Sequence, residues 1–333
     1  MIDLNFKRIV VSRTDSIGDV MLTLPLCAWI KQQFPNATVL FLGKTYTEPI
    51  IRAFDAIDGF LNWSEIENQP KSIKQQLVRE WQADVIIHVF PRKEIAQLAK
   101  SAKIPIRVGT SHRNYHLLTC SHRVNFTRKR SNLHESQLNF NLLKPFGLDE
   151  IPGIEDVSKE TKHFKAPNIE LPETFKSLDN YVILHPKSQG SAVEWPIEKY
   201  VELGRQIQQK GFTTVFTGTE KEGELFRSQL NGLSFVDATG KLTLDQLMVL
   251  ISGASGFVAC STGPLHIAGF LGVRVVGLFA PRRPIHPGRW KPLGSNAVTI
   301  VNDPECEMCK KGKPCDCITK IESKRVLEML KLD

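Results

Sequence analysis

Short runs rich in β-branched and aromatic residues alternate with segments of helical period, and this alternation occurs twice along the 333-residue chain. The first series of runs covers 8–12, 37–43, 59–63, 83–89 and 106–110, and the second covers 181–186, 212–218, 234–240, 256–261 and 274–280. Strands that alternate with helices form parallel sheets whose faces are covered by the helices. The pattern therefore predicts an α/β protein with two doubly wound, Rossmann-like domains.

A stretch of low periodicity separates the two series. Residues 151–178 are rich in Pro, Lys and Glu, which is typical of a linker. We therefore predict an N-terminal domain over 1–175 and a C-terminal domain over 176–318. The last segment, 319–333, begins with a capping-box pattern and is predicted to form a helix that packs back on the N-terminal domain.

Several classes of protein are disfavoured by what the sequence lacks. No apolar run approaches the length of about 18 residues that a membrane span needs. The N-terminus, "MIDLNFKRIVVSR", has none of the features of a secretory signal peptide, so we expect a cytoplasmic protein. The glycine motifs of dinucleotide oxidoreductases and of P-loop NTPases are both absent from the sequence, which argues against these two classes of enzyme.

Basic residues gather in one part of the first domain. The formal net charge of the chain is +8, and no Asp or Glu occurs from Ile95 to His134. Tyr115, Leu117 and Leu118 lie in the same stretch, and apolar groups beside cations suit an amphiphilic anion such as a lipid phosphate or an acidic glycolipid. A solvated basic surface is the alternative, and no nucleic-acid partner is expected because no recognition motif is present. The candidate acceptor-binding residues are Arg113, Arg123, Arg128, Lys129 and Arg130.

Three loops that follow strands hold the residues best suited to chemistry, because ligands of open parallel sheets bind beyond the carboxyl ends of the strands. These loops are 13–25, 185–196 and 261–266. In the first loop, Asp19 follows a glycine at the start of a helix, so its carboxylate faces the ligand and can take a proton from an attacking hydroxyl. Asp15 of the same loop is interpreted more simply as a helix cap.

The loop at 261–266 ends an apolar strand and begins a helix with Pro264 in its first turn. The unpaired N–H groups and the dipole of a helix start attract anions. This loop is therefore predicted to cradle a diphosphate, and a plain N-cap by Ser261 or Thr262 is the alternative.

Four of the seven cysteines lie close together in "CEMCKKGKPCDC". The C-x2-C-x5-C-x-C spacing could place four thiolates around a zinc ion, and the alternative is a loop of reduced thiols. The residues are Cys306, Cys309, Cys315 and Cys317.

The segments "RTDSIGDVMLTLP", "HPKSQGSAVEWP" and "STGPLHIAGFLGVRVVGLFAP" together resemble glycosyltransferase family nine, the ADP-heptose:lipopolysaccharide heptosyltransferases. The resemblance runs over nearly the whole chain. It implies the GT-B architecture, in which two Rossmann-like domains face each other across a cleft, with the acceptor bound mainly by the first and the donor by the second. It also implies an inverting enzyme that needs no cofactor and no catalytic metal.

The resemblance assigns roles to individual residues. It makes Asp19 the general base. It also implies that the start of the helix at 262–266 binds the donor diphosphate. Two positions depart from the pattern of the family. Val193 stands where many relatives have Lys or Arg, and Lys187 is the nearest residue that could supply the missing cation. Ser261 stands where many relatives have Asp. The ribose is assigned to Glu222, with Glu220 and Glu224 as competitors. The donor-binding set is Ser261, Thr262, Gly263, Pro264, Leu265, His266, Lys187, Ser188 and Glu222.

The expected function is inverting transfer of a sugar, with ADP-L-glycero-D-manno-heptose as the expected donor, onto an anionic lipopolysaccharide inner-core acceptor. The enzyme would work at the inner face of the cytoplasmic membrane as a peripheral protein. Two alternatives stay open at this stage: a transferase of the same architecture with a different nucleotide sugar, and a sugar-nucleotide hydrolase or epimerase.

Overall fold

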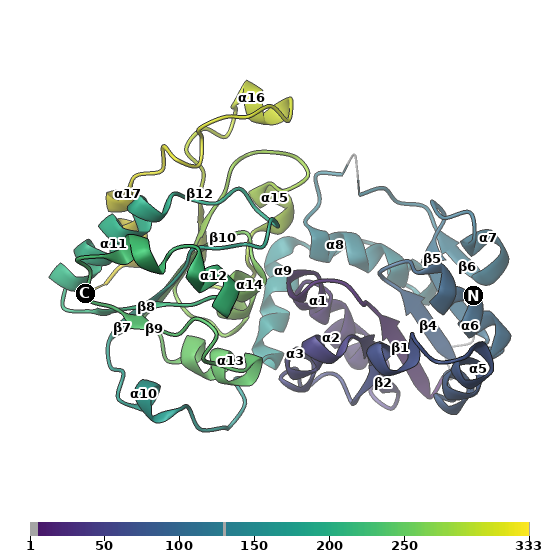
Figure 1. The fold of residues 1–333 in the computed structure, drawn as a ribbon. Coiled ribbons are helices and arrows are strands. Elements are labelled where there is room, and N and C mark those ends of the chain that lie inside the picture. Colours follow the sequence, from purple (N-terminus) through teal and green to yellow (C-terminus); the bar gives the residue numbers. More distant parts are fainter. Residues whose placement is uncertain (1–5, 129–130, 333) are drawn as a thin grey trace. The chain divides into compact units, whose positions relative to one another are not determined.

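The computed structural model describes residues 6–128 and 131–332 of the chain. These residues form two compact units, and the boundary lies between Phe164 and Lys165. In Figure 1 the colours of the first unit run from purple to teal, and those of the second from teal to yellow. Within the described ranges, no helix has both the length and the apolar character that a membrane crossing requires.

The first unit is built on a parallel sheet of six strands in the order β3-β2-β1-β4-β5-β6. At its centre, Val10 of β1 is paired with Leu40 of β2 and with Ile86 of β4. Successive residues of a strand point to opposite faces, and Val10 and Val11 are both fully buried, so both faces of this sheet are covered. The strands are β1 (Arg8–Ser12), β2 (Thr38–Gly43), β3 (Gly59–Asn62), β4 (Val85–His88), β5 (Ile106–Thr110) and β6 (His122–Val124).

The second unit has a parallel sheet with the order β12-β11-β10-β7-β8-β9. Numbered from its own first strand, this order is the same as that of the first unit, which is the order of dinucleotide-binding Rossmann folds. The prediction of two doubly wound parallel sheets is therefore confirmed. The strands are β7 (Tyr181–His185), β8 (Thr213–Phe216), β9 (Val236–Asp237), β10 (Gly256–Cys260), β11 (Val275–Leu278) and β12 (Ala297–Ile300).

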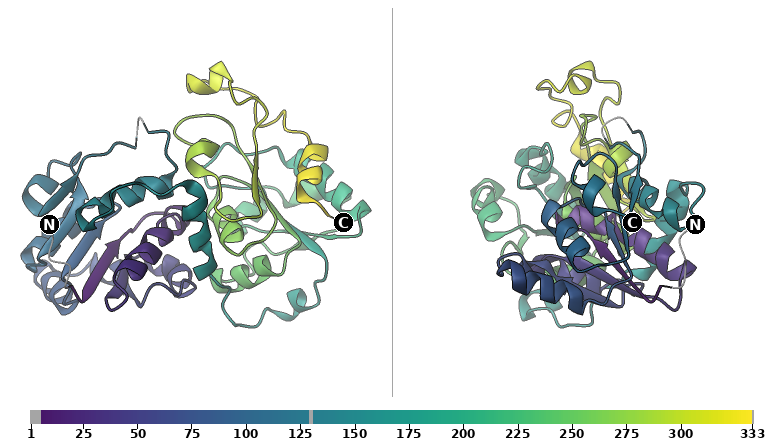
Figure 2. Two further views of the ribbon diagram at one scale, coloured as in Figure 1. Left: turned by 180° about the vertical axis from the view of Figure 1, so that it is seen from behind. Right: turned by 90° about the vertical axis from the view of Figure 1, so that its right-hand side faces the viewer.

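Helices connect successive strands and lie against the sheets, as the two further views in Figure 2 show. Their apolar residues are buried there. The helices of the first unit are α1 (Ile17–Met21), α2 (Leu24–Gln33), α3 (Glu48–Arg52), α4 (Trp63–Ile66), α5 (Lys71–Glu80), α6 (Lys93–Ser101), α7 (His116–Thr119), α8 (Glu135–Phe140) and α9 (Ile154–Lys159). Those of the second are α10 (Glu173–Lys176), α11 (Ile197–Gln209), α12 (Glu220–Glu224), α13 (Leu244–Ser252), α14 (Gly263–Phe270), α15 (Pro287–Trp290), α16 (Glu307–Lys310) and α17 (Ser323–Leu330). Short 3-10 helices are η1 (Thr45–Thr47), η2 (Asn141–Phe146), η3 (Glu160–His163) and η4 (Arg227–Leu230).

Two expectations about the domain limits need correction. The chain passes between the units earlier than residue 175, because α9 and the buried Phe164 belong to the first unit. The C-terminal helix α17 packs on the second unit, not on the first. Its buried residues Val326 and Leu330 join Val182 and Ile207 in one apolar core, because its apolar side packs against α11 of the second unit.

Candidate active site

The winding of each sheet reverses at one place, between β1 and β4 in the first unit and between β7 and β10 in the second. At such switch points the connections leave toward opposite faces, which creates room for a ligand at the carboxyl ends of the strands. The loop 13–25 leaves β1, and the loops 185–196 and 261–266 leave β7 and β10. All three loops singled out in the sequence therefore border a switch point.

Asp19 lies in the first turn of the short helix α1, which follows β1. Ser16 caps this helix, and its Oγ donates a hydrogen bond of 2.6 Å to Oδ2 of Asp19. The side chain of Asp19 keeps 20% of its surface exposed. A hydroxyl group of a ligand can therefore reach this carboxylate, while the cap limits its orientation.

A buried arginine that the sequence analysis missed connects both aspartates of the loop. The Arg13 residue is 3% exposed, donates to Asp15 through Nε and Nη2 at 2.9 and 3.1 Å, and contacts Asp19 through Nη2. Burial raises the pKa of Asp15 above its ordinary value, although the charge of Arg13 opposes this rise. The helix cap expected at Asp15 is supplied by Ser16, so Asp15 acts as an ion-pair partner instead.

Two residues of helix α8 accept hydrogen bonds from Nη1, the remaining nitrogen of the Arg13 guanidinium. Oε1 of Glu135 accepts from Arg13 Nη1 at 3.3 Å, and Oδ1 of Asn139 accepts from the same nitrogen at 3.2 Å. Arg128 donates to the same two oxygens at 3.0 and 3.1 Å. Glu135 is 1% exposed, and a buried carboxylate needs compensating cations. Arg128, expected to bind the acceptor, is therefore engaged in the network that fixes Arg13.

The other expected acceptor-binding cations lie at the edge of the first sheet. Arg113 follows β5, Arg123 belongs to the edge strand β6, and both are exposed. Between them, Leu117 and Leu118 of α7 are 57% and 75% exposed. We call these four residues the α7 surface; it combines positive charge with apolar groups. Two predicted cations lie outside the described residues: Lys129 and Arg130.

In the second unit, the buried strand β10 leads directly into α14. Oγ1 of Thr262 accepts from the backbone N–H of Leu265 at 3.4 Å, so the N-cap considered as the simpler interpretation is present. The cap does not use the N–H of Gly263, and Pro264 has none to offer. His266 is buried on the same helix. A diphosphate cradle at this helix start remains a prediction, and Gly263 is its available first-turn donor.

The loops after β7 and β10 contact each other, since Oγ of Ser191 donates to the carbonyl of Ser261 at 3.1 Å. Lys187 pairs with Glu194 at 2.9 Å, and Ser188 donates to Glu194 from its backbone N–H and its Oγ at 2.8 and 2.9 Å. Burial opposes ionisation of Glu194, but these hydrogen bonds lower its pKa overall. The expected pair of donor-binding residues is therefore oriented by a carboxylate that the sequence analysis missed.

Glu222, expected to hold the ribose, completes a capping box at the start of α12. Its Oε2 accepts from the backbone N–H and the Oγ1 of Thr219 at 2.7 and 2.9 Å. The charge of Glu222 raises the pKa of His185, although burial lowers that pKa more strongly. Because His185 is the last residue of β7, Glu222 lies near the switch point of the second sheet. The competitor Glu220 is exposed and held by Arg227 at 2.6 and 2.8 Å.

Two histidines at strand ends are buried. Nδ1 of His185 lies 2.9 Å from Oγ1 of Thr217, and burial lowers the pKa of His185 to about 4. Burial, helped by the charge of His116, lowers the pKa of His88, the last residue of β4, to about 3. Neither ring nitrogen of His88 has a hydrogen-bond partner in the part of the chain that the structure describes. Both rings are therefore neutral near pH 7.

The buried His88 predicts a loss of stability in acid. Its pKa is lowered from 6.5 to about 3 on folding, so its contribution is complete above pH 6.5 and is lost as the pH falls from 6.5 toward 3. At pH 5 the cost is about 2 kcal/mol. Thermal unfolding of wild type and of His88→Leu at pH 7 and pH 5 checks this: the substitution is expected to flatten the pH dependence. The exposed His112→Leu is the control, and an equal flattening by both would contradict the expectation.

Solved glycosyltransferases share this two-sheet architecture. A glycosyltransferase family 9 protein from Veillonella parvula DSM 2008 has a TM-score of 0.77 over 99% of this chain and 98% of its own, at 20% identity. An E. coli heptosyltransferase solved with ADP has a TM-score of 0.73 over 97% of this chain and 99% of its own, at 16% identity. At such identities the likeness concerns the fold, which is that of the GT-B class of glycosyltransferases.

The sequence comparison identifies the family. The sequence model of "Glycosyltransferase family 9 (heptosyltransferase)" matches residues 71–318. The chain belongs to this family and is a glycosyltransferase. Among its curated relatives, lipopolysaccharide heptosyltransferase 3 of Escherichia coli strain K12 is 24% identical over 301 residues, which cover 84% of each chain.

Proposed function

We propose that this glycosyltransferase is an inverting enzyme that transfers L-glycero-D-manno-heptose from its ADP derivative to an anionic lipopolysaccharide inner-core acceptor. The observation that carries the proposal is the carboxylate of Asp19 at the β1 switch point, oriented by Arg13 and Ser16 and still reachable. The names of its relatives support the substrate class, since one is a lipopolysaccharide heptosyltransferase and another was solved with ADP.

In the proposed step, Asp19 takes the proton of an acceptor hydroxyl while that oxygen bonds to the anomeric carbon of the donor sugar. The bond from this carbon to the diphosphate breaks on the opposite face, so the configuration inverts and the electron pair leaves with ADP. Arg13 and Ser16 each donate to a different carboxylate oxygen, and each oxygen keeps a further lone pair for the proton. General base catalysis of this kind is worth about 10² to 10⁴ in rate.

The second unit supplies the proposed donor site. Ser261 and Gly263 at the start of α14 would face the diphosphate, where a helix start stabilises developing negative charge. Lys187 would bind the same diphosphate through its ammonium group, which now pairs with Glu194 and would turn from this partner to the donor. Glu222 would accept hydrogen bonds from the ribose hydroxyls through Oε1, the oxygen that its capping box leaves unused.

The first unit supplies the proposed acceptor site on the α7 surface. A phosphorylated glycolipid combines anionic groups with an apolar part, and the α7 surface pairs two arginines with two exposed leucines. Such a surface suits transient binding at an anionic membrane face. We place the enzyme in the cytoplasm, with peripheral contact at the inner face of the cytoplasmic membrane, and assign it no nucleic-acid partner.

Replacing Arg113 and Arg123 together by Ser is expected to raise the KM for the acceptor by about 10- to 100-fold, because the two contacts to charged groups, weakened by their exposure, are together worth about 1.5 to 3 kcal/mol. The KM for the donor should change little. Steady-state kinetics at two salt concentrations check this, since the variant should also lose part of its salt sensitivity. The double variant Arg79→Ser and Arg205→Ser removes the same charge from exposed positions elsewhere. An equal rise in this control would refute a specific acceptor site.

Thermal shift with a panel of ADP-, UDP- and GDP-sugars tests the donor assignment. A ligand present at about 100 times its Kd stabilises the folded protein by about 2.7 kcal/mol. ADP-heptose and ADP are expected to stabilise the enzyme, and the uridine and guanosine compounds are not. A larger shift with a UDP- or GDP-sugar would overturn the proposed nucleotide.

A further inference from the structure

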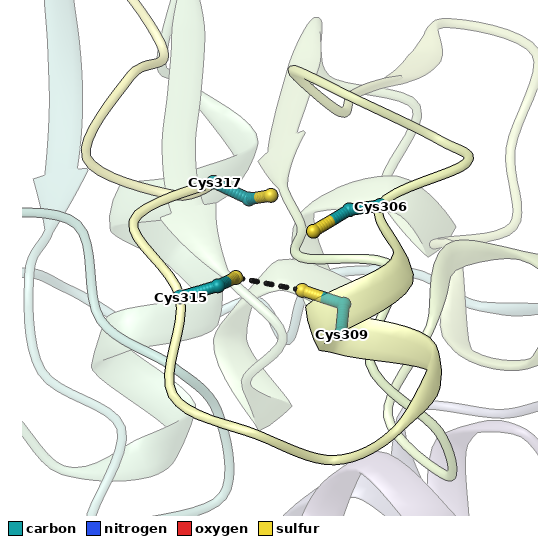
Figure 3. Close-up of side chains that lie close together, drawn as sticks. All are labelled: Cys306, Cys309, Cys315 and Cys317. Carbon is teal, nitrogen blue, oxygen red and sulfur yellow. Dashed lines mark hydrogen bonds between the residues drawn. The ribbon is translucent and has the colours of Figure 1, made fainter.

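We propose that the four clustered cysteines bind a structural zinc ion that holds the loop 302–317 to the second unit. The Sγ atoms of Cys306, Cys309, Cys315 and Cys317 all lie within 4.8 Å of one another, and Figure 3 shows the four side chains pointing toward a common centre. In a tetrahedral Zn–S4 site with bonds of about 2.3 Å, the sulfur atoms are roughly 3.8 Å apart. Small side-chain shifts therefore suffice to bring them to coordination distance.

The local backbone explains how the loop gathers these side chains. Cys306 and Cys309 stand at the two ends of one turn at the start of α16, three residues apart and thus on one face. The chain then reverses at Gly312, whose φ of +67° favours glycine. Cys315 and Cys317 follow with one residue between them, and Figure 3 shows both side chains directed toward Cys306 and Cys309. The two pairs therefore face each other across the loop.

In the part of the chain that the structure describes, few contacts other than those of the cysteines hold the loop 302–317 to the rest of the second unit. Within the described chain, its hydrogen bonds and ion pairs reach no further than Lys320. Met308 is 45% exposed, so it contributes little apolar packing. The small core at this place consists of the cysteines and Ala280 alone. Short segments without an apolar core depend on a crosslink or a metal.

A single ion explains the arrangement better than disulfide bonds do. Two disulfides would require two separate pairs, whereas here all four sulfur atoms are mutual neighbours. A closed set of four protein ligands leaves no open coordination position, which is the hallmark of a structural and not a catalytic zinc site.

The place of the cluster gives the ion a definite role. Ala280, which packs against Cys309 and Cys317, lies two residues beyond the end of β11. Figures 1 and 2 show α16 extending away from the sheet of the second unit in every view, so the cluster is the anchor of this extension. Loss of the ion should therefore release the loop 302–317 and leave both sheets folded.

Elemental analysis of the full-length protein, purified without added metal, is the primary test. About one zinc ion per chain is expected. Cys309→Ser and Cys315→Ser should each lose most of this zinc, whereas Cys120→Ser, a half-buried cysteine outside the cluster, should retain it. Iron in place of zinc, or no metal together with fully reduced thiols, would overturn the proposal.

Two measurements on the wild-type chain cover the case in which the Ser variants do not fold. Replacement of the bound metal by Co²⁺ should give the visible absorption of a tetrahedral tetrathiolate site. Removal of zinc by a chelator should expose 302–317 to limited proteolysis at least about 10-fold faster, as expected for a segment that has lost its ordering ligand. Unchanged proteolysis, or disulfides within the cluster detected by mass spectrometry, would contradict the zinc site.

Discussion

Replacing Asp19 by Asn should lower kcat for sugar transfer by at least about 100-fold, because the amide keeps the shape of the side chain but cannot accept the proton of the acceptor. Donor binding should change little, since Asp19 belongs to the first unit and the proposed donor site to the second. Steady-state kinetics and calorimetry with the nucleotide sugar measure the two effects separately.

Asp15→Asn is the matched control for this prediction. It removes the other carboxylate held by Arg13, in the same loop and with equal exposure of its side chain. Its effect on kcat should be clearly smaller, because Asp15 serves to anchor Arg13. If Asp15→Asn abolished turnover and Asp19→Asn did not, the assignment of the general base would be wrong.

The second large effect is expected at Arg13. Arg13→Met would leave the buried Glu135 without one of its cations, and removal of one partner from a buried ion pair costs about 3 to 5 kcal/mol. Arg13→Lys should recover only part of this stability, since an ammonium cannot reproduce the several directed hydrogen bonds of a guanidinium. Chemical denaturation measures both losses.

Arg52→Met provides the comparison for a surface ion pair. Arg52 is 75% exposed and pairs with Glu48 one helical turn away, a contact worth less than about 1 kcal/mol. A loss of stability at Arg13 no larger than that at Arg52 would show that the buried network does not stabilise the first unit.

The central strands could be predicted from sequence because their residues are buried on both faces. β1 occurs at the predicted residues and β10 within one residue of them, since both apolar runs are almost fully buried and each is followed by a helix start. The edge strands β6 and β12 could not be predicted in this way. β6 is only three residues long, begins with His122 in a basic stretch, and exists because it pairs with Val108 of β5. Such a strand depends on its neighbour more than on its own composition.

The C-terminal helix shows how a local signal can mislead. The pattern Thr319-x-x-Glu322 predicted a helix start at Thr319, but Oγ1 of Thr319 donates to the carbonyl of Asp316 and the helix begins at Ser323. Capping residues also favour turns, and here the turn that closes the cysteine loop uses the same side chain.

The position of Asp19 could be predicted because it depends on a local pattern of strand, glycine and helix. Its supporting residues could not be predicted, because Glu135 lies 122 positions from Arg13 in the sequence. The partner of Lys187 is only seven residues away, but nothing in the local pattern shows that Glu194 folds back onto it. Long-range charge pairs of this kind follow from the tertiary fold.

The most direct test of the proposed reaction is to incubate the purified enzyme with ADP-heptose and a lipopolysaccharide core acceptor that lacks heptose, with Asp19→Asn in parallel. Mass spectrometry and NMR should show one heptose added with inverted anomeric configuration, and ADP released only when the acceptor is present. The Asp19 variant should form at least about 100-fold less product in the same time. Free heptose released at the same rate without acceptor, or a product with retained configuration, would contradict the account.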